Sequence, residues 1–280
     1  MLRIATRGSA LARWQAARVV ELLGASEHEL IIVTTTGDAR TDAPIHQLGG
    51  QGVFVKEVQR CVIDGHADVA VHSAKDLPAS TPSTLLLAAI PERADVRDAL
   101  VGSKLADLRH GAVVGTGAVR RRAQLRSVRP DLEFGELRGN VDTRLTKATQ
   151  FDAVVLASAA LARLGRDDAI SELLDIDVMV PQVAQGALAV ECRSDDTSTR
   201  AALHSIDDPK LHREVDAERA YLAALGGGCD LPVGALCTTE PDGNLRLRAF
   251  LDTEAGPRRA DVVGSDPIEL GGRAADEVRS

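Results

Sequence analysis

Aromatic residues are scarce in this chain: they make up 2% of its 280 residues, and Trp14 and Tyr221 are the only members of their types. The hydrophobic core must therefore consist mainly of Ala, Val, Leu and Ile. Single-stranded nucleic acids are bound largely by stacking bases on aromatic side chains. Together with a formal net charge of −8, this scarcity argues against nucleic acids and anionic membranes as partners.

The four cysteines, Cys61, Cys192, Cys229 and Cys237, form no CxxC pair and have no histidine at a zinc-ligand spacing. We therefore expect no metal site. The chain has no uninterrupted apolar run of transmembrane length, and the residues after Met1 lack the apolar segment of a signal peptide. These absences predict a reduced, cytoplasmic protein.

Lysine is rare as well, since only five of the 33 basic residues are lysine. Arginine carries a planar, permanent charge that suits carboxylates and phosphates. Six arginines recur at the ends of expected strands and helices, and open α/β sheets bind ligands at the carboxyl ends of their strands. As a group they predict a site for a polyanionic ligand, although each one taken singly is more typical of a surface ion pair, and the excess of arginine also fits codon composition. They are Arg7, Arg120, Arg121, Arg138, Arg144 and Arg163.

Short apolar runs alternate with helical segments through the first two thirds of the chain, a rhythm typical of α/β architecture. Ser9 and Gly24 are placed to cap a helix over 10–23. Apolar runs of this kind suit parallel strands that are covered on both faces. Residues 37–52 are polar and glycine-rich, which predicts a long functional loop. Strands are expected at 2–6, 30–35, 69–72, 85–90, 112–115 and 153–157, and a second helix at 53–64.

The last seventy or so residues change character. A helical segment at 209–225 ends in three glycines, strand patterns follow at 233–239 and 245–251, and a final helix is expected near 266–278. This order predicts a small α+β domain at the C-terminal end.

Three local features are able to carry chemistry, each with a plainer alternative. Asp76 follows an expected buried strand, so its carboxylate is either a general acid/base or cation stabiliser, or a turn carboxylate. Gly115 begins a turn whose free N–H groups either hold an anion at a helix start or simply close the turn. Cys229 follows three glycines and is either an accessible, nucleophilic thiol or just a small residue.

Seven segments stand out, in order over nearly the whole chain: IATRGSALARWQA (4–16), TTGDARTDAPIHQLGGQGVFVKE (35–57), DVAVHSAKDLP (68–78), GTGAVRRRAQL (115–125), LRGNVDTRL (137–145), PQVAQGALAVECR (181–193) and GGGCDLPVG (226–234). Together they resemble the porphobilinogen deaminase (hydroxymethylbilane synthase) family. Any one of them is weak evidence, but seven in register are specific.

The resemblance implies an α/β fold with two periplasmic-binding-protein-like (type 2) α/β domains plus a small C-terminal α+β domain. By analogy, domain 1 covers 1–91 and 187–204, domain 2 covers 95–182, and domain 3 covers 209–280. The active cleft would lie between the first two domains, and the third would carry Cys229 on a loop.

The resemblance also implies a transferase of tetrapyrrole and haem biosynthesis. A dipyrromethane cofactor would be attached to Cys229 through a thioether. Four molecules of the substrate porphobilinogen would be joined to it head to tail, each with loss of ammonia, and hydrolysis would then release hydroxymethylbilane. The family analogy favours a monomer.

Site residues are carried over position by position. Asp76 matches the catalytic aspartate, which contacts pyrrole N–H groups. The positions that match cofactor contacts, besides Cys229, are Ser73, Lys75, Thr116, Arg120, Arg121, Arg144 and Gln185. The positions that match substrate contacts are Arg7, Ser9, Gln15, Phe54, Arg138 and Arg163.

The chain departs from the family pattern at three positions. Gln47 and Gln51 stand where the family often has lysine, and Ala118 stands where it has a hydroxyl residue in the turn after Gly115. These changes affect expected lid contacts and one cofactor contact. The alternatives are a non-catalytic two-domain anion-binding protein of the periplasmic-binding type, which needs neither Asp76 nor Cys229, and a catalytically inactive relative.

Overall fold

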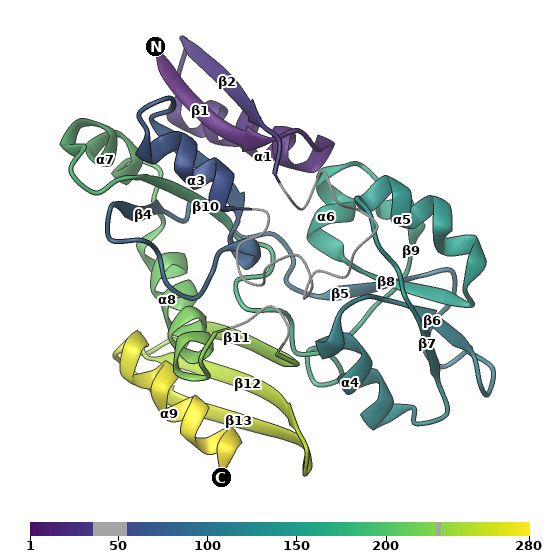
Figure 1. Ribbon diagram of the computed structural model, residues 1–280. Helices are drawn as coiled ribbons and strands as arrows, with labels where there is room; N and C mark the ends of the chain where they lie inside the picture. The colour runs from purple at the N-terminus through teal and green to yellow at the C-terminus, as the bar shows by residue number, and fades with distance from the viewer. Residues whose placement is uncertain (36–54, 228–230) are drawn as a thin grey trace.

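The computed structural model describes residues 1–35, 55–227 and 231–280, and their strands form three separate sheets (Figure 1). The first sheet has the strand order β2-β1-β3-β10-β4. Strand β1 pairs in parallel with β2 and β3, whereas β10 is antiparallel to β3 and β4. Its elements are β1 (Leu2–Arg7), α1 (Ala10–Leu23), β2 (His28–Val33), α3 (Lys56–Ile63), β3 (Val69–Ser73), β4 (Leu85–Ala89), β10 (Leu188–Arg193) and α7 (Thr197–His204).

The second sheet has the order β7-β6-β8-β5-β9. Strand β6 pairs in parallel with β7 and β8, and β5 is antiparallel to β8 and β9. Its elements are β5 (Asp98–Val101), β6 (Val113–Gly115), α4 (Val119–Val128), β7 (Glu133–Gly135), α5 (Val141–Lys147), β8 (Ala153–Ala157), α6 (Ser158–Arg163) and β9 (Ile170–Leu173). Short 3-10 helices lie at η2 (Ala74–Asp76), η3 (Ala148–Gln150) and η4 (Asp167–Ala169).

The third sheet is antiparallel, in the order β11-β12-β13, and packs against two helices. Its elements are α8 (Pro209–Ala224), β11 (Val233–Thr239), β12 (Leu245–Thr253), β13 (Gly256–Gly264) and α9 (Pro267–Arg279). The N-terminus lies at the far end of the first sheet, and the C-terminus lies at the third (Figure 1). The expected class, two α/β units followed by a small α+β unit, is confirmed.

Local sequence explains the element that leads into the site. Helix α1 begins where Ser9 Oγ accepts a hydrogen bond from the Ala12 N–H at 3.2 Å, and it ends at Gly24, whose φ of +60° glycine tolerates best. Both caps are as the sequence predicts. The interpretation of 85–90 as a parallel strand is wrong, because β4 pairs antiparallel with β10.

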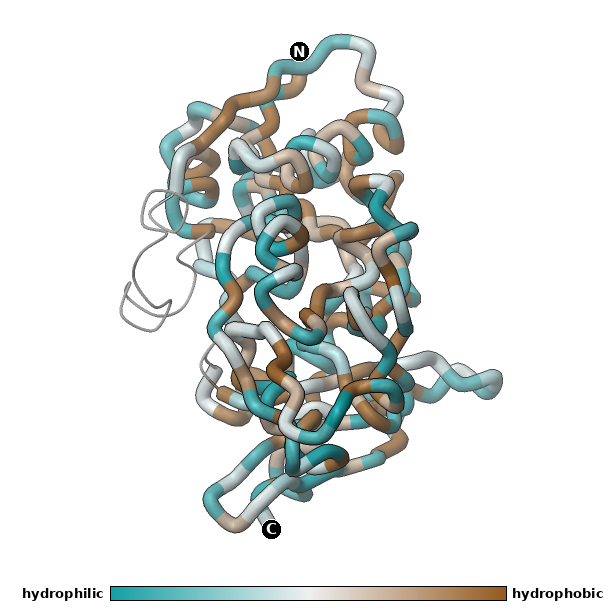
Figure 2. The backbone as a smooth tube through the Cα atoms, turned by 90° about the vertical axis from the view of Figure 1, so that its right-hand side faces the viewer, coloured by the Kyte–Doolittle hydropathy of each residue, from teal (hydrophilic) through white to brown (hydrophobic). Residues whose placement is uncertain are grey.

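The hydrophobic residues occur in short stretches that hydrophilic ones interrupt (Figure 2). Among the residues that the structure describes, every helix is too short or too polar to span a lipid bilayer. The largest hydrophobic cluster joins Ala74 in η2 and Leu77 directly after it to residues of the third sheet such as Val233 and Leu247. The turn that carries Asp76 is therefore built on the same core as the C-terminal unit.

One buried carboxylate ties the units together. Glu218 on α8 is fully buried and accepts hydrogen bonds from Arg93 at 2.7 and 3.1 Å, in the segment between the first and second sheets. It also accepts from the N–H of Ala184 at 2.6 Å, on the returning segment, and from the N–H of Cys237 at 2.8 Å, in β11. Both passages of the chain between the sheets are thus fixed to α8.

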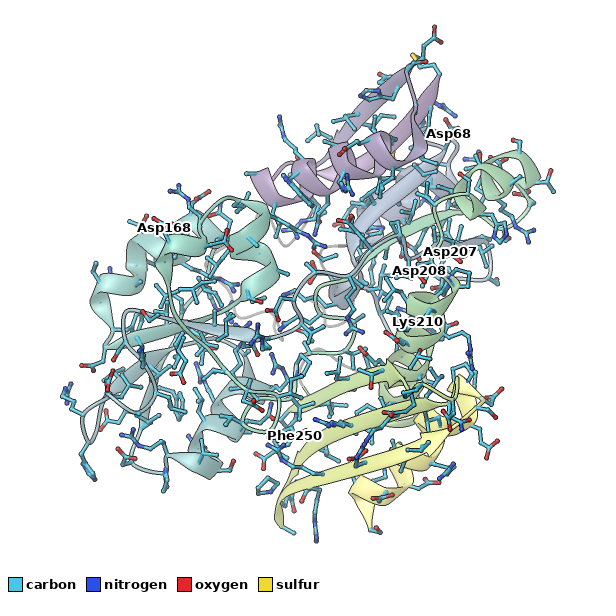
Figure 3. All side chains as sticks on the ribbon, turned by 180° about the vertical axis from the view of Figure 1, so that it is seen from behind. Asp68, Asp168, Asp207, Asp208, Lys210 and Phe250 are labelled. Atoms are coloured by element: carbon cyan, nitrogen blue, oxygen red, sulfur yellow. The ribbon has the colours of Figure 1, made fainter. Side chains whose placement is uncertain are left out.

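A second carboxylate, that of Asp207, makes contacts just before the start of α8. Asp207 Oδ1 accepts from the Ile90 N–H at 2.8 Å and lies 2.8 Å from His212 Nδ1. Its neighbour Asp208 caps α8 by accepting from the N–H groups of Lys210 and Leu211. Asp207, Asp208 and Lys210 lie together at this joint (Figure 3). The entry to α8 is therefore held against the end of β4.

Two adjacent glycines of α9 are expected to respond oppositely to alanine. A Cβ on Gly271 would lie 2.5 Å from Tyr221 N and 2.6 Å from Ala220 Cβ, at the contact with α8, whereas a Cβ on Gly272 meets nothing within 4 Å. Overpacking should destabilise Gly271→Ala by about 1–3 kcal/mol. The gain in helix propensity should stabilise Gly272→Ala by about 0.5–1 kcal/mol. Denaturant unfolding followed by circular dichroism measures both, and equal effects would contradict the close approach of α8 and α9.

Candidate functional site

A pocket opens at the carboxyl ends of β1 and β3. Five of the residues that line it are ones the sequence analysis selected: Arg7, Ser9, Gln15, Ser73 and Asp76. Arg7 is the last residue of β1 and Ser73 the last of β3, and these strands are parallel through their shared register. Side chains that end neighbouring parallel strands meet at one edge of the sheet, and of the six arginines that the sequence singled out, Arg7 lines this pocket.

Asp76 ends η2, the single turn that follows β3. The turn is held by the Ala74 N–H, which donates to Ala187 O at 3.0 Å, and by the buried side chains of Ala74 and Leu77. Asp76 Oδ2 lies 3.9 Å from Arg7 Nη1, and 33% of the Asp76 side chain is exposed. The turn that carries Asp76 is thus anchored, and the carboxylate is accompanied by a cation and accessible to a ligand.

The other polar groups of the pocket have defined partners. Gln15 Nε2 donates to Ser73 Oγ at 2.6 Å, which links α1 to the end of β3. The Ser9 hydroxyl caps α1. His72, which sequence reasoning did not select, also lines the pocket, and its Nε2 lies 3.2 Å from Oε2 of the fully buried Glu191. Gln59 Nε2 donates a hydrogen bond to the same oxygen of Glu191 at 2.9 Å.

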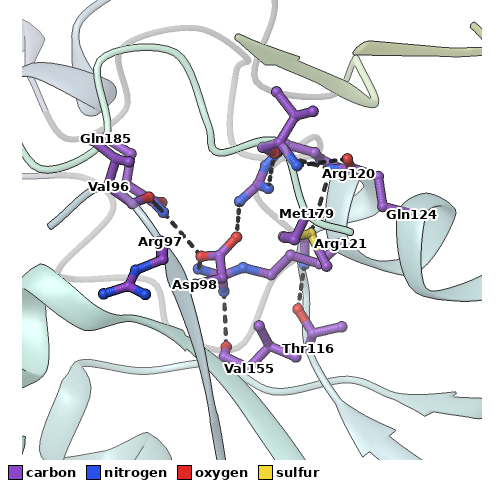
Figure 4. Close-up of polar contacts among 12 residues, drawn as sticks. Val96, Arg97, Asp98, Thr116, Arg120, Arg121, Gln124, Val155, Met179 and Gln185 are labelled. Carbon is purple, nitrogen blue, oxygen red and sulfur yellow. Dashed lines mark hydrogen bonds and ion pairs between the residues drawn. The ribbon is translucent and has the colours of Figure 1, made fainter. Parts of the chain in front are cut away.

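A second group of predicted residues gathers around Asp98, the first residue of β5 (Figure 4). Oδ2 of Asp98 accepts from Arg120 Nη2 at 2.7 Å, and Oδ1 accepts from Arg121 Nη2 at 2.8 Å and from Gln185 Nε2 at 3.0 Å. Arg120 Nη1 donates to Val180 O at 2.5 Å, and Arg121 Nη1 donates to Val155 O at 2.9 Å. The two arginines are therefore held from both sides within the protein.

Charge keeps Asp98 ionised in this buried place. Burial alone would raise the pKa of its carboxyl group, but the charges of Arg120 and Arg121 and their hydrogen bonds outweigh burial and hold that pKa well below its usual range. Burial lowers the pKa of Arg120. Asp98 was missed by the sequence analysis; an acidic residue at the start of the apolar run DALV is the one signal for it.

The pKa shifts of Lys75 and Arg144 indicate that the pocket around Asp76 and the arginine group around Asp98 are neighbours. Burial lowers the pKa of Lys75 to about 8, Arg121 and Arg144 add to that effect, and Asp76 and Asp98 oppose it. Burial likewise lowers the pKa of Arg144 to about 10, with Arg121 adding to it and Asp76 opposing it. Because such effects weaken with distance, Lys75, Asp76, Arg121 and Arg144 share one neighbourhood.

The low pKa of Lys75 has a measurable consequence. With methyl-labelled lysines, the NMR signal of Lys75 should titrate near pH 8 rather than near the ordinary 10.5. Between these values the unfolded chain binds more protons than the folded protein, so this group makes the unfolding free energy increase with pH in that window. Lys75→Arg identifies the signal by its loss, with Lys104→Arg as the exposed control. A Lys75 signal that titrates at 10.5 would disprove the burial.

Three further predicted residues lie outside the pocket lining. Arg163 on α6 donates through Nη2 to Gly186 O at 2.7 Å and lies over the Trp14 ring, 5.4 Å from its centroid. Arg138 Nε donates to Glu136 at 2.8 Å. The buried Thr116 accepts from the Ala118 N–H at 3.2 Å, within the turn that opens α4. The structure thus gives all three partners in the protein itself.

Phe54, Cys229, Gln47 and Gln51 lie outside the described residues, as does the loop expected at 37–52. The other cysteines are described. Cys192 and Cys237 are fully buried and Cys61 is half-buried, and burial raises the pKa of all three thiols. None of these three is an activated nucleophile, since reactivity requires the thiolate.

The strand that follows Cys229 in sequence is tied to the arginine group. The Ala235 N–H of β11 donates to Pro181 O at 2.9 Å, and a Cβ on Gly234 would lie 2.8 Å from Val180 O. Val180 O is also the acceptor for Arg120. Only glycine allows β11 to approach this segment so closely.

Comparison with known proteins identifies what the chain resembles. The family model described as porphobilinogen deaminase, dipyromethane cofactor binding domain, matches residues 2–201, and the one described as porphobilinogen deaminase, C-terminal domain, matches residues 212–280. The chain is 46% identical over 289 residues to the porphobilinogen deaminase of Roseiflexus sp. (strain RS-1), covering 99% of this chain and 95% of the relative. It is 46% identical over 296 residues to that of Acidothermus cellulolyticus, covering 100% and 89%.

Among solved structures, the VFT2 domain of BvgS from Bordetella pertussis aligns with 78% of this chain and 92% of its own, at 18% identity and a TM-score of 0.44.

Proposed function

The chain belongs to the porphobilinogen deaminase family, and from that premise we propose how its side chains carry out the reaction. The protein is a transferase of tetrapyrrole biosynthesis with porphobilinogen deaminase activity, and residues 2–201 contain its dipyrromethane cofactor binding domain. The observation that carries the residue assignment is the accessible carboxylate of Asp76, with Arg7 at 3.9 Å and the half-buried cations Lys75 and Arg144 beside it.

The residues present fit a dipyrromethane, which bears several carboxylates and two pyrrole N–H donors. Around Asp98, Arg121 Nε and Gln185 Oε1 are buried and have no hydrogen-bond partner among the described residues, so one donor and one acceptor remain for a ligand. We propose that Lys75, Arg120, Arg121 and Arg144 hold the carboxylates. Ser73, Thr116 and Gln185 would line the same site, and Cys229 would form the covalent attachment. When bound, the cofactor supplies the free pyrrole α-carbon at which each new unit is joined.

Asp76 is proposed as the catalytic residue. When ammonia leaves porphobilinogen, positive charge develops on the substrate's pyrrole nitrogen, and a fixed carboxylate nearby stabilises that charge. The short turn η2, anchored through Ala74 and Leu77, keeps Asp76 from moving away as the reaction proceeds. Arg7 is near enough to bind a substrate carboxylate beside it.

The remaining substrate residues divide by position. Ser9 and Gln15 line the pocket with Arg7, and we propose that they contact the incoming porphobilinogen there, with Phe54. Arg138 and Arg163 lie outside the pocket lining. We propose that they meet the carboxylates of a longer chain, because each added unit brings two more and increases the demand for cations.

We further propose a cytoplasmic monomer with domains at 1–91 plus 187–204, 95–182 and 209–280. In support, each of these divisions contains the strands of one sheet. Light scattering on the purified protein tests the monomer.

Intact-mass measurement combined with turnover tests the whole assignment. Freshly purified protein should carry the mass of two pyrrole units, and incubation with porphobilinogen should release ammonia and give uroporphyrin I after chemical closure of the product. A non-catalytic anion-binding protein would bind porphobilinogen without ammonia release. Protein with neither adduct nor product, even after prolonged supply of porphobilinogen, would refute the proposal.

A further inference from the structure

Asp98 occupies an unusual place in the arginine group. It is fully buried, and its two oxygens take one guanidinium each: Oδ2 that of Arg120 and Oδ1 that of Arg121. Consecutive helix residues do not face the same direction, so the carboxylate is what brings these two neighbours together. Each guanidinium uses two of its N–H groups in these contacts and has others left over.

The charges in this group do not balance. Asp98 supplies one negative charge against the two positive charges of Arg120 and Arg121, and Gln185, the third donor to Asp98, is neutral. Lys75 is influenced by the charges of Asp76, Arg121, Asp98 and Arg144, so the three cations beside the two carboxylates leave the wider group positive as well. An uncompensated charge in a protein interior is costly, so the folded protein is prepared for an additional anion here.

We propose that Asp98 is a positioning residue that acts as a resident counter-charge: it holds Arg120 and Arg121 in place before the cofactor's carboxylates arrive and shares them with those carboxylates afterwards. The proposal rests on the proposed function. It predicts that Asp98 contributes more to the stability of the protein without cofactor than to that of the loaded protein, because the cofactor's carboxylates then balance part of the charge of Arg120 and Arg121.

The test compares apo-protein, produced without a supply of porphobilinogen, with the same protein after loading by added porphobilinogen. The variant Asp98→Asn keeps the shape of the side chain and removes its charge. Its thermal midpoint, Tm, should fall much further in the apo form than in the loaded form. Loading should therefore raise the Tm of Asp98→Asn by roughly 3 °C or more beyond the increase seen in the wild type.

A matched control lies three residues away. Asp95 pairs with Arg97 at 2.6 Å, and the side chains are 37% and 40% exposed, in contrast to the fully buried Asp98. Asp95→Asn should leave the increase in Tm on loading at the wild-type value. If Asp98→Asn loses the same Tm in both forms, Asp98 is an ordinary buried ion-pair partner and the proposal is overturned.

A second variant covers the case in which Asp98→Asn does not fold. The double variant Asp98→Asn, Arg121→Gln restores the surplus of one positive charge. Folding of the double variant would show that charge, not packing, made Asp98 necessary; an unfolded double variant would overturn the proposal. Intact mass separates the two claims. Wild type that gains no adduct after loading with porphobilinogen refutes the proposed function, whereas wild type that gains the adduct, with equal Tm increases in wild type and Asp98→Asn, refutes only the role of Asp98.

Discussion

Replacing Asp76 by Asn is expected to lower the turnover of porphobilinogen by a factor of about 10²–10³, the cost of removing one fixed electrostatic contact to a developing charge. The side chain keeps its size, and the anchors of its turn, the Ala74 N–H to Ala187 O bond and the buried Leu77, are untouched. The variant should therefore fold and keep the two-pyrrole adduct while losing the negative charge that ammonia loss requires.

Ammonia release and product absorbance, measured beside intact mass, check this expectation. The exposed Asp107 in the second unit provides a control, since Asp107→Asn should behave as wild type. Near-normal turnover of Asp76→Asn would remove Asp76 from the catalytic role. Loss of the adduct together with a lowered Tm would reassign it to folding.

Replacing Cys229 by Ser should abolish the adduct and lower turnover by roughly 10³-fold or more, because attachment turns each coupling into a reaction between groups held in place. A serine hydroxyl is a far weaker nucleophile than a thiolate at neutral pH. The described cysteines offer no replacement, since burial raises the pKa of the thiols of Cys61, Cys192 and Cys237.

Cys61 is the matched control, as the most exposed of these three. Cys61→Ser should keep both adduct and turnover. An adduct that persists in Cys229→Ser would show that another residue carries the attachment.

The positions of Arg7 and Asp76 at strand ends could be predicted from local patterns, whereas Ser9, Gln15 and Ser73 were assigned to a site only through the family resemblance. Arg7 and Ser73 end apolar runs of strand type, and the carboxyl ends of neighbouring parallel strands coincide in space. Ser9 is both a recognisable helix cap and a pocket residue. For Arg7, Ser73 and Ser9, the strand ends and the helix cap that the local sequence predicts are the positions that they occupy in the structure.

Asp98 and Glu218 could not be predicted in the same way. Gln185 is 87 positions from Asp98, and Arg93 is 125 positions from Glu218. No periodicity links residues so far apart; they meet only because the chain passes twice between the sheets. Strand β13 was not predicted for another reason. Three consecutive exposed residues, Pro257 to Arg259, interrupt the alternation of buried and exposed side chains that is typical of a strand.

The anchoring of Arg93 by Glu218 bears on how the protein can be divided and in what order it matures. A chain that stops before α8 would retain Arg93 in the interior without its carboxylate, at a cost of several kcal/mol. The first two sheets therefore reach their final stability only once residue 218 has been synthesised. In evolution, the C-terminal unit cannot readily be replaced by an unrelated one, because Glu218 on its helix α8 is the partner of the buried Arg93 between the first two sheets.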